Sequence, residues 1–163
     1  MVRMTRNRTV LAIDIGTKAG WALYQPKRAL LWGTVEFKNH RFEGGGMKWI
    51  RFRAWLDEMG SSCGPDLVLF EEVRRHMGTD AAHIYGGFVA ELTAWCELRG
   101  ISYAAIPVGS IKKAATGRGN ASKNDMVDAV RKLGYDVANH NEADAVAILL
   151  AHGVIGDVVT TDA

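Results

Sequence analysis

Three strand-like segments follow one another near the start of the chain, with only short turns between them. Residues 9–15, 20–24 and 29–37 are rich in apolar and β-branched side chains, and turn-forming residues at 16–18 and 25–27 separate them. A link of a few residues can only reverse the chain, because a parallel connection needs a dozen or more residues. Residues 9–37 therefore predict an antiparallel meander against which the rest of the chain must pack.

Downstream, helices alternate with strands. Apolar residues at helical spacing predict helices over 47–59, which residues 60–65 interrupt, and over 79–99. Apolar runs predict strands over 66–73 and 101–108. Strands joined through helices pair in parallel. We therefore expect one α/β domain with a five-stranded mixed sheet, three antiparallel strands and then two parallel strands, flanked by helices.

The last third of the chain is predicted to be mostly helical. A short helix is predicted over 110–115, followed by a glycine-containing loop over 116–121. Ser122 is a predicted N-cap for a helix ending at Leu133, with Asp125 as its box-like partner. Asn141 is the predicted N-cap of a final helix that ends before Gly153.

Length and composition fit a single globular domain. The 163 residues suit one core, which we place over 9–155, between a basic lead-in over 1–8 and a tail over 156–163. A net charge of +2 neither requires nor excludes nucleic acid. Cys63 and Cys96 form no metal-type spacing and favour a reducing compartment. With no signal peptide and no apolar run of membrane-spanning length, we expect a cytoplasmic protein that makes no membrane contact.

Three carboxylates stand at places where strands and helices can bring them together. Asp14 ends the first apolar strand, Glu71 follows the apolar run LVLF, and Asp144 lies in the predicted first turn of the last helix. Their mutual repulsion would be removed by a divalent cation, and hard oxygen ligands suit Mg²⁺, with Mn²⁺ as a substitute. Two such ions about 4 Å apart activate a water and stabilise a leaving oxygen in phosphodiester cleavage.

Each carboxylate also has an ordinary structural interpretation. Asp14 would serve as a turn or cap residue, and Glu71 or Glu72 as a surface charge at a strand end. Asp144 would simply favour the positive end of a helix dipole. Their joint placement favours the metal-site interpretation.

Basic residues gather in short clusters that would attract phosphates. The alternative is ordinary solvated surface. The candidate DNA-binding residues are Arg74, Arg75, Lys112, Lys113, Arg118 and Lys123.

Four segments together carry a family resemblance. LAIDIGTKAGWAL, LVLFEEV, KKAATGRGNASKNDMV and NEADAVAILLAH occur in the order and spacing of the RuvC family of Holliday-junction resolvases. The resemblance covers about residues 9–152, with a phage-borne member as a weaker expectation. It implies an RNase H-like fold, a homodimer, branched DNA as substrate, especially four-way junctions, and metal-dependent nicking of two opposed strands without an organic cofactor.

The resemblance assigns roles to matching residues. Asp14, Glu71 and Asp144 match the family's catalytic, metal-binding acids, and Glu72 would then point to the opposite face of the strand. The lysines after and before the glycine loop, Lys123 and Lys112, would hold phosphates near the metals. Their alternative interpretation is that of solvated lysines flanking a helix.

Two positions depart from the family pattern. Asn141 stands where the family carries an acid or a histidine, so Asn141, His140 or Glu142 would complete the catalytic and metal-binding set, unless Asn141 is only the N-cap. Arg74 stands where bacterial resolvases carry an aromatic wedge. An arginine there would bind phosphate or stack through its guanidinium plane.

The helix over 79–99 occupies the place of the family's dimer-forming helix. Gly86 and Gly87 would allow close contact with a second helix. The alternative is a helix that packs only on its own sheet. A two-fold dimer would match a junction with two equivalent strands.

Three rival functions stay open. The YqgF family of RNase H-like nucleases, linked to RNA processing, shares the DxGTK turn and fits residues 13–23 equally well. A sugar-kinase or actin-like ATPase would need two such domains and about twice the length. A branched-DNA-binding protein without catalysis is suggested only by Asn141.

Overall fold

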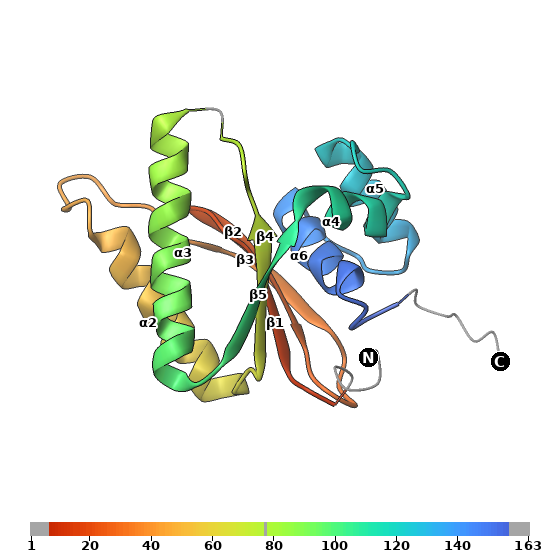
Figure 1. Ribbon diagram of the computed structural model, residues 1–163, viewed down its shortest axis with the longest axis horizontal. Helices are drawn as coiled ribbons and strands as arrows, with labels where there is room; N and C mark the ends of the chain where they lie inside the picture. The colour runs from red at the N-terminus through yellow and green to blue at the C-terminus, as the bar shows by residue number, and fades with distance from the viewer. Residues whose placement is uncertain (1–6, 77, 157–163) are drawn as a thin grey trace.

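The computed structural model describes residues 7–76 and 78–156, and its centre is a five-stranded sheet in the order β3-β2-β1-β4-β5 (Figure 1). The first three strands pair antiparallel, whereas β4 is parallel to both β1 and β5. The predicted mixed sheet is therefore confirmed. The strands are β1 (Val10–Asp14), β2 (Lys18–Tyr24), β3 (Leu31–Glu36), β4 (Leu67–Glu72) and β5 (Ser102–Pro107).

Two helical layers cover the sheet (Figure 1). Helices α2 (Met47–Cys63) and α3 (Thr79–Arg99) lie on one face. Helices α4 (Val108–Thr116), α5 (Lys123–Lys132) and α6 (His140–Ala151) lie on the other face. The predicted bounds of α3 are confirmed at both ends, and Gly100 terminates it with a φ of 66° in the left-handed region.

The apolar run of β1 is explained by burial on both faces of the sheet. Leu11 and Ile13 pack into the core that α2 and α3 cover, while Val10 and Ala12 pack into the core around α6. All four side chains are fully buried. A strand covered on both faces needs no polar alternation, so Asp14 is the first residue of β1 that can reach solvent.

The predicted break after residue 59 is wrong, because α2 continues through Gly60 to Cys63 and ends at Gly64. A Cβ on Gly60 would lie 2.9 Å from the Trp95 ring. Gly60 is therefore a close-packing position between α2 and α3, and the left-handed residue that ends the helix is Gly64, with a φ of 55°.

The last helix begins two residues earlier than expected. Asn139, not Asn141, is the N-cap, and its side-chain oxygen accepts a hydrogen bond of 3.0 Å from the amide of Glu142. The Asn139 amide group also donates to Thr34 on β3, which holds the cap against the sheet. The N-cap prediction for Asn141 is therefore wrong, and Asp144 lies in the second turn. The capping box of Ser122 and Asp125 is confirmed.

Except for Asn7, Arg8 and Gly156, the predicted lead-in over 1–8 and tail over 156–163 lie outside the described residues. Among the helices within the described ranges, none combines the length and the apolar character that a bilayer crossing requires.

Candidate functional site

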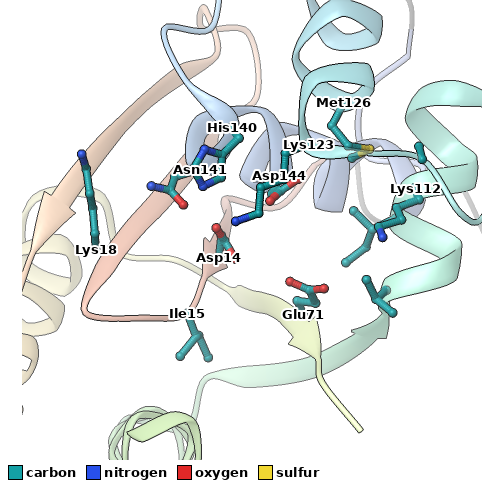
Figure 2. Close-up of a pocket in the computed structure, with 13 residues that line it drawn as sticks. Asp14, Ile15, Lys18, Glu71, Lys112, Lys123, Met126, His140, Asn141 and Asp144 are labelled. Atoms are coloured by element: carbon teal, nitrogen blue, oxygen red, sulfur yellow. The ribbon is translucent and has the colours of Figure 1, made fainter. Parts of the chain in front are cut away.

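A cavity of about 370 Å³ opens where β1 and β4 end against α4, α5 and α6. Its walls carry charged and amide groups from both the sheet and the helices (Figure 2). The polar side chains that line it are Asp14, Lys18, Glu71, Lys112, Lys123, His140, Asn141 and Asp144.

Strand pairing brings the first two carboxylates together. β1 and β4 are parallel neighbours, with Ile13 opposite Phe70. Asp14 and Glu71 are the next residues along each strand, so both reach the same edge of the sheet. Glu72 faces away from this cavity and forms an ion pair of 3.2 Å with Arg74.

The third carboxylate arrives because α6 rests directly on β2. Gly20 pairs with Asp14 across the sheet. A Cβ on Gly20 would overlap the backbone carbonyl of Asn141 and would lie 2.9 Å from the amide nitrogen of Glu142. The missing side chain lets the first turn of α6 approach the backbone of β2, and one turn later Asp144 reaches the cavity.

Burial raises the pKa of all three carboxyl groups, and repulsion between the acids adds to the shift at Asp14 and Asp144. Burial, followed by the charges of Asp144 and Glu71, raises the pKa of Asp14 well above its ordinary value, against a smaller opposing effect of Lys123. Burial and then Glu71 raise the pKa of Asp144 to about 7, while Lys123 and Lys112 oppose the shift. Burial also raises the pKa of Glu71, and Lys112 opposes it. In all three groups burial outweighs the opposing lysines, so ionising these carboxyl groups is unfavourable unless a further cation lies close by.

Cationic side chains stand on two sides of the acids. Lys112 from α4 and Lys123 from the start of α5 lie on the helical side, and Lys18 stands on the β2 side near Asn141 (Figure 2). Burial, then Lys123 and Lys18, lowers the pKa of His140. Lys18 was missed as a site residue because the sequence placed it in a turn, whereas it is the first residue of β2.

The other predicted DNA-binding residues lie outside this cavity. Lys113 is exposed on α4 and does not line it. Arg118 forms an ion pair of 3.2 Å with Asp125. Arg74 and Arg75 line a second hollow of about 570 Å³, which shares Glu71 with the first.

The structure reduces the number of residues that can fill the fourth position of the acidic cluster. His140 and Asn141 both line the cavity, whereas Glu142 does not. The Glu142 side chain is buried, accepts a hydrogen bond of 2.7 Å from the amide of Ala138 and one from Thr34, and so supports the loop before α6. Asn141 does not cap the helix, so its amide oxygen is available in the cavity beside Asp14.

The donor set suits a hard cation. The carboxylates of Asp14, Glu71 and Asp144 and the amide oxygen of Asn141 offer hard oxygen ligands, and the burial that raises the three pKa values makes the ionised carboxylates costly without a cation. Over 7–76 and 78–156, no three side chains of His, Cys, Asp or Glu are grouped closely enough to hold one metal ion. Mg²⁺ does not need such a cage, because it keeps several waters and takes one or two carboxylates together with substrate phosphates.

Neither a model of a protein family nor a curated protein sequence matches the chain. Solved structures do match it. RuvC of T. thermophilus in complex with a Holliday junction substrate superposes with a TM-score of 0.75 and 25% sequence identity, over 90% of this chain and 93% of that one. The fold is that of RuvC. The resemblance inferred from four sequence segments and the RNase H-like fold that it implied are both confirmed.

Two further structures agree with the RuvC fold. A second Thermus thermophilus RuvC structure has a TM-score of 0.71 and 24% identity over 90% of this chain and 93% of that one. The yeast mitochondrial Holliday junction resolvase Ydc2 has a TM-score of 0.58 and 15% identity over 94% of this chain and 82% of that one. The similarity thus spans the sheet and both helical layers.

Proposed function

We propose that the protein is a structure-specific endonuclease that resolves four-way DNA junctions by hydrolysing phosphodiester bonds. One observation carries the proposal: Asp14, Glu71 and Asp144 line one cavity with three lysines, at the edge of a sheet whose fold is that of RuvC. The RuvC structure with the higher TM-score contains a Holliday junction substrate and matches 90% of this chain.

Asp14, Glu71, Asp144 and Asn141 would hold Mg²⁺, for which Mn²⁺ can substitute. When bound, the metal supplies an activated water and stabilises the charge on the leaving oxygen. Asp14 interacts electrostatically with both other carboxylates and would hold the metal together with them. Glu71 on β4 and Asp144 on α6 would each serve one side of the site.

The lysines would hold the scissile phosphate. Lys123 is close enough to oppose the rise in the pKa values of Asp14 and Asp144. Lys112 does the same for Glu71 and Asp144. A cation there stabilises negative charge as it develops on the phosphate in the transition state. Lys18 would contact the same strand from the opposite wall of the cavity.

We also infer a homodimer that uses α3. A two-fold enzyme matches a junction that offers two equivalent strands. One face of α3 packs on the sheet through Phe88 and Leu92, while Ala90 and Ala94 stay exposed on the other face. Gly87 already packs within the chain, because a Cβ there would overlap the Trp49 ring of α2.

A cleavage assay tests the proposal. The purified protein is incubated with four-way, three-way, flap and linear DNA substrates, and with a structured RNA, in Mg²⁺, in Mn²⁺ and in EDTA. We expect paired nicks in the four-way junction only when a metal is present. Cleavage of RNA alone would favour the YqgF-like alternative, and binding without cleavage in either metal would favour a non-catalytic branched-DNA-binding protein.

The Asp14→Asn variant tests the role of the acidic cluster. It removes one charge and retains an oxygen, so we expect junction binding within a few-fold of wild type and loss of cleavage. Binding should weaken steeply with salt, because most contacts would go to phosphates. A fully active Asp14→Asn protein would refute the metal-site assignment.

A further inference from the structure

The loop between β3 and α2 displays an aromatic side chain in a way that packing does not explain. Phe42 is 93% exposed, the most exposed large apolar side chain in the described part of the chain. Its φ of 70° lies in the left-handed region, which bulky residues rarely adopt. Such strain persists only where the surrounding structure enforces it, and it clusters at functional sites.

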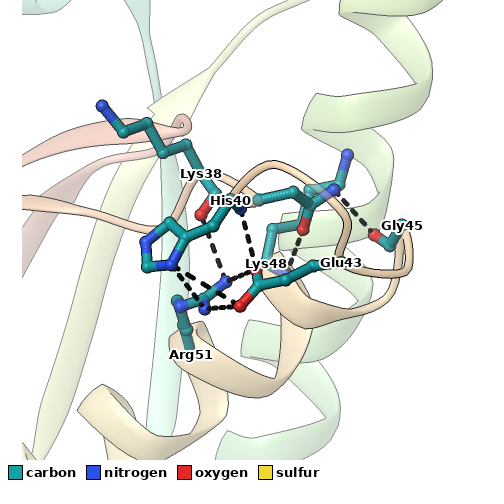
Figure 3. Close-up of polar contacts among 7 residues, drawn as sticks. Lys38, His40, Glu43, Gly45, Lys48 and Arg51 are labelled. Carbon is teal, nitrogen blue, oxygen red and sulfur yellow. Dashed lines mark hydrogen bonds and ion pairs between the residues drawn. The ribbon is translucent and has the colours of Figure 1, made fainter.

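Hydrogen bonds that involve His40 and Glu43 anchor the loop just before and just after position 42 (Figure 3). Both carboxylate oxygens of Glu43 accept from the Arg51 guanidinium of α2, at 2.5 and 2.8 Å, and Glu43 also accepts 2.7 Å from the amide of His40. Asn39 accepts from the amide of Lys48 and donates to the carbonyl of Gly45. The exposure of Phe42 is therefore a built feature of an ordered loop.

The acid at the centre of this network stays ionised. The hydrogen bonds from Arg51 and from the amide of His40 lower the pKa of Glu43 to about 2. The network consequently persists at any pH at which the protein would work.

The surroundings of Phe42 are cationic. The Arg41 guanidinium lies 5.0 Å from the ring centroid, and Lys38 and Lys48 flank the loop. The nearby acids already have partners, Glu36 with Lys38 at 3.3 Å and Glu43 with Arg51. Over residues 38–48, Phe42 is the only large apolar side chain that is exposed. An aromatic ring among cations suits a nucleic acid, whereas an apolar protein partner needs a contiguous apolar patch.

The loop starts at the edge of the sheet that carries the acidic cavity. Lys18 of the cavity pairs with Glu36 at the end of β3, and the amide of Phe37 donates 2.7 Å to the carbonyl of Thr17. From there the chain runs out beyond the sheet before it returns as α2 (Figure 1). The loop and the cavity therefore lie at the same end of the β2-β3 pair, and a branched substrate that fills the cavity would extend toward the loop.

We propose that the loop over residues 38–46 is a second DNA contact, in which Phe42, backed by Arg41, stacks on a base exposed at the branch point while Lys38 contacts a phosphate. The inference rests on the proposed function, because it names how the same substrate is recognised away from the cavity. Base stacking is interrupted at a branch, so a base plane is available there that a continuous duplex does not offer. Stacking tolerates any base, since every base has a π-face.

Equilibrium binding of a labelled four-way junction and of a linear duplex, measured in EDTA to prevent cleavage, tests the loop. We expect Phe42→Ala and Phe42→Leu each to weaken junction binding by about tenfold, from the usual contribution of one stacked base. Phe42→Trp should bind like wild type, and duplex binding should change less than twofold in all three variants. Leu31→Ala, which truncates a half-exposed side chain at the opposite end of β3, is the matched control and should change neither.

Two further measurements separate stacking from a general charge effect. Lys38→Ala should reduce the slope of log affinity against log salt by about one phosphate contact. Photo-crosslinking with 5-iodouracil placed at the branch point should attach to the peptide that contains Phe42. Crosslinks found only elsewhere, or a Phe42→Leu variant that binds like wild type, would overturn the stacking assignment.

Binding measurements on the wild type and on Phe42→Ala distinguish a wrong loop contact from a wrong function. A wild-type protein that binds no branched DNA overturns both. A wild-type protein that binds the junction, together with a Phe42→Ala variant of equal affinity and unchanged melting temperature, overturns only the loop contact.

Discussion

The contact between Gly20 and the first turn of α6 gives the sharpest test of how the site is built. In Gly20→Ala, the new methyl would overlap the carbonyl of Asn141 and would lie 2.9 Å from the amide nitrogen of Glu142, where ordinary contacts begin at 3.4 Å. The atoms in the way are backbone, so no side chain can rotate to relieve the overlap. The first turn of α6 must move away from β2, and Asn141 and Asp144 must move with it.

The expected effects follow from that displacement. Overpacking of a close-packed contact costs about 1–3 kcal/mol of unfolding free energy. A displacement of about 1 Å in a catalytic group lowers the rate by about 10²-fold. Junction binding in EDTA should stay within a few-fold of wild type, because Lys112 and Lys123 lie on α4 and α5 and do not depend on this contact.

Urea unfolding and single-turnover junction cleavage at saturating protein measure these effects. Gly109→Ala is the matched control for stability, because a Cβ there meets nothing within 4 Å and the residue lies inside α4, away from the proposed dimer helix. The control should gain up to about 1 kcal/mol from helix propensity. A Gly20→Ala protein with unchanged stability would refute the close approach of α6 to β2. Reduced stability with normal cleavage would refute the link between that contact and the site.

Three other predictions concern charge and packing. In EDTA, the metal-free protein should lose stability as pH rises from about 4 to about 7, because the folded state keeps the proton of Asp144 up to about pH 7 while the unfolded state releases it near 3.8. Asp144→Asn should flatten this decline in thermal melts and raise the melting temperature at pH 8. An unchanged profile would contradict the burial of that carboxylate. Gly87→Ala should lose about 1–3 kcal/mol in urea unfolding, because its methyl would overlap the Trp49 ring. A stability equal to wild type would contradict the packing of α2 on α3. Lys18→Ala should reduce the slope of log affinity against log salt for junction binding by about one phosphate contact. Lys27→Ala, in the turn at the far end of β2, should leave that slope unchanged. Equal slopes for the two variants would contradict the assignment of Lys18 to the site.

Local patterns in the sequence determined the sheet and most of the helices. Links too short for a crossover required β1, β2 and β3 to be antiparallel, and the connections through helices required β4 and β5 to be parallel. The capping box at Ser122 and the terminating Gly100 were readable because each depends on residues only a few positions away. Asp14 and Glu71 were predictable as strand-end residues for the same reason, since each follows an apolar run, whereas their adjacency depends on the pairing of β1 with β4.

Contacts between residues far apart in the sequence decided where α6 begins and which of its side chains face the cavity. Two asparagines could cap α6, and Asn139 does so with Thr34, 105 residues away, holding it to the sheet. That choice moves Asn141 into the cavity, while Glu142 turns to the buried loop.

Gly60 was predicted to break a helix and Gly20 to begin a strand, yet both are places where another backbone or a ring comes close. Backbone preferences and periodicity act over a few residues, so they specify the elements of the fold. Which side chains of those elements face one another depends on packing, and here packing completed the site.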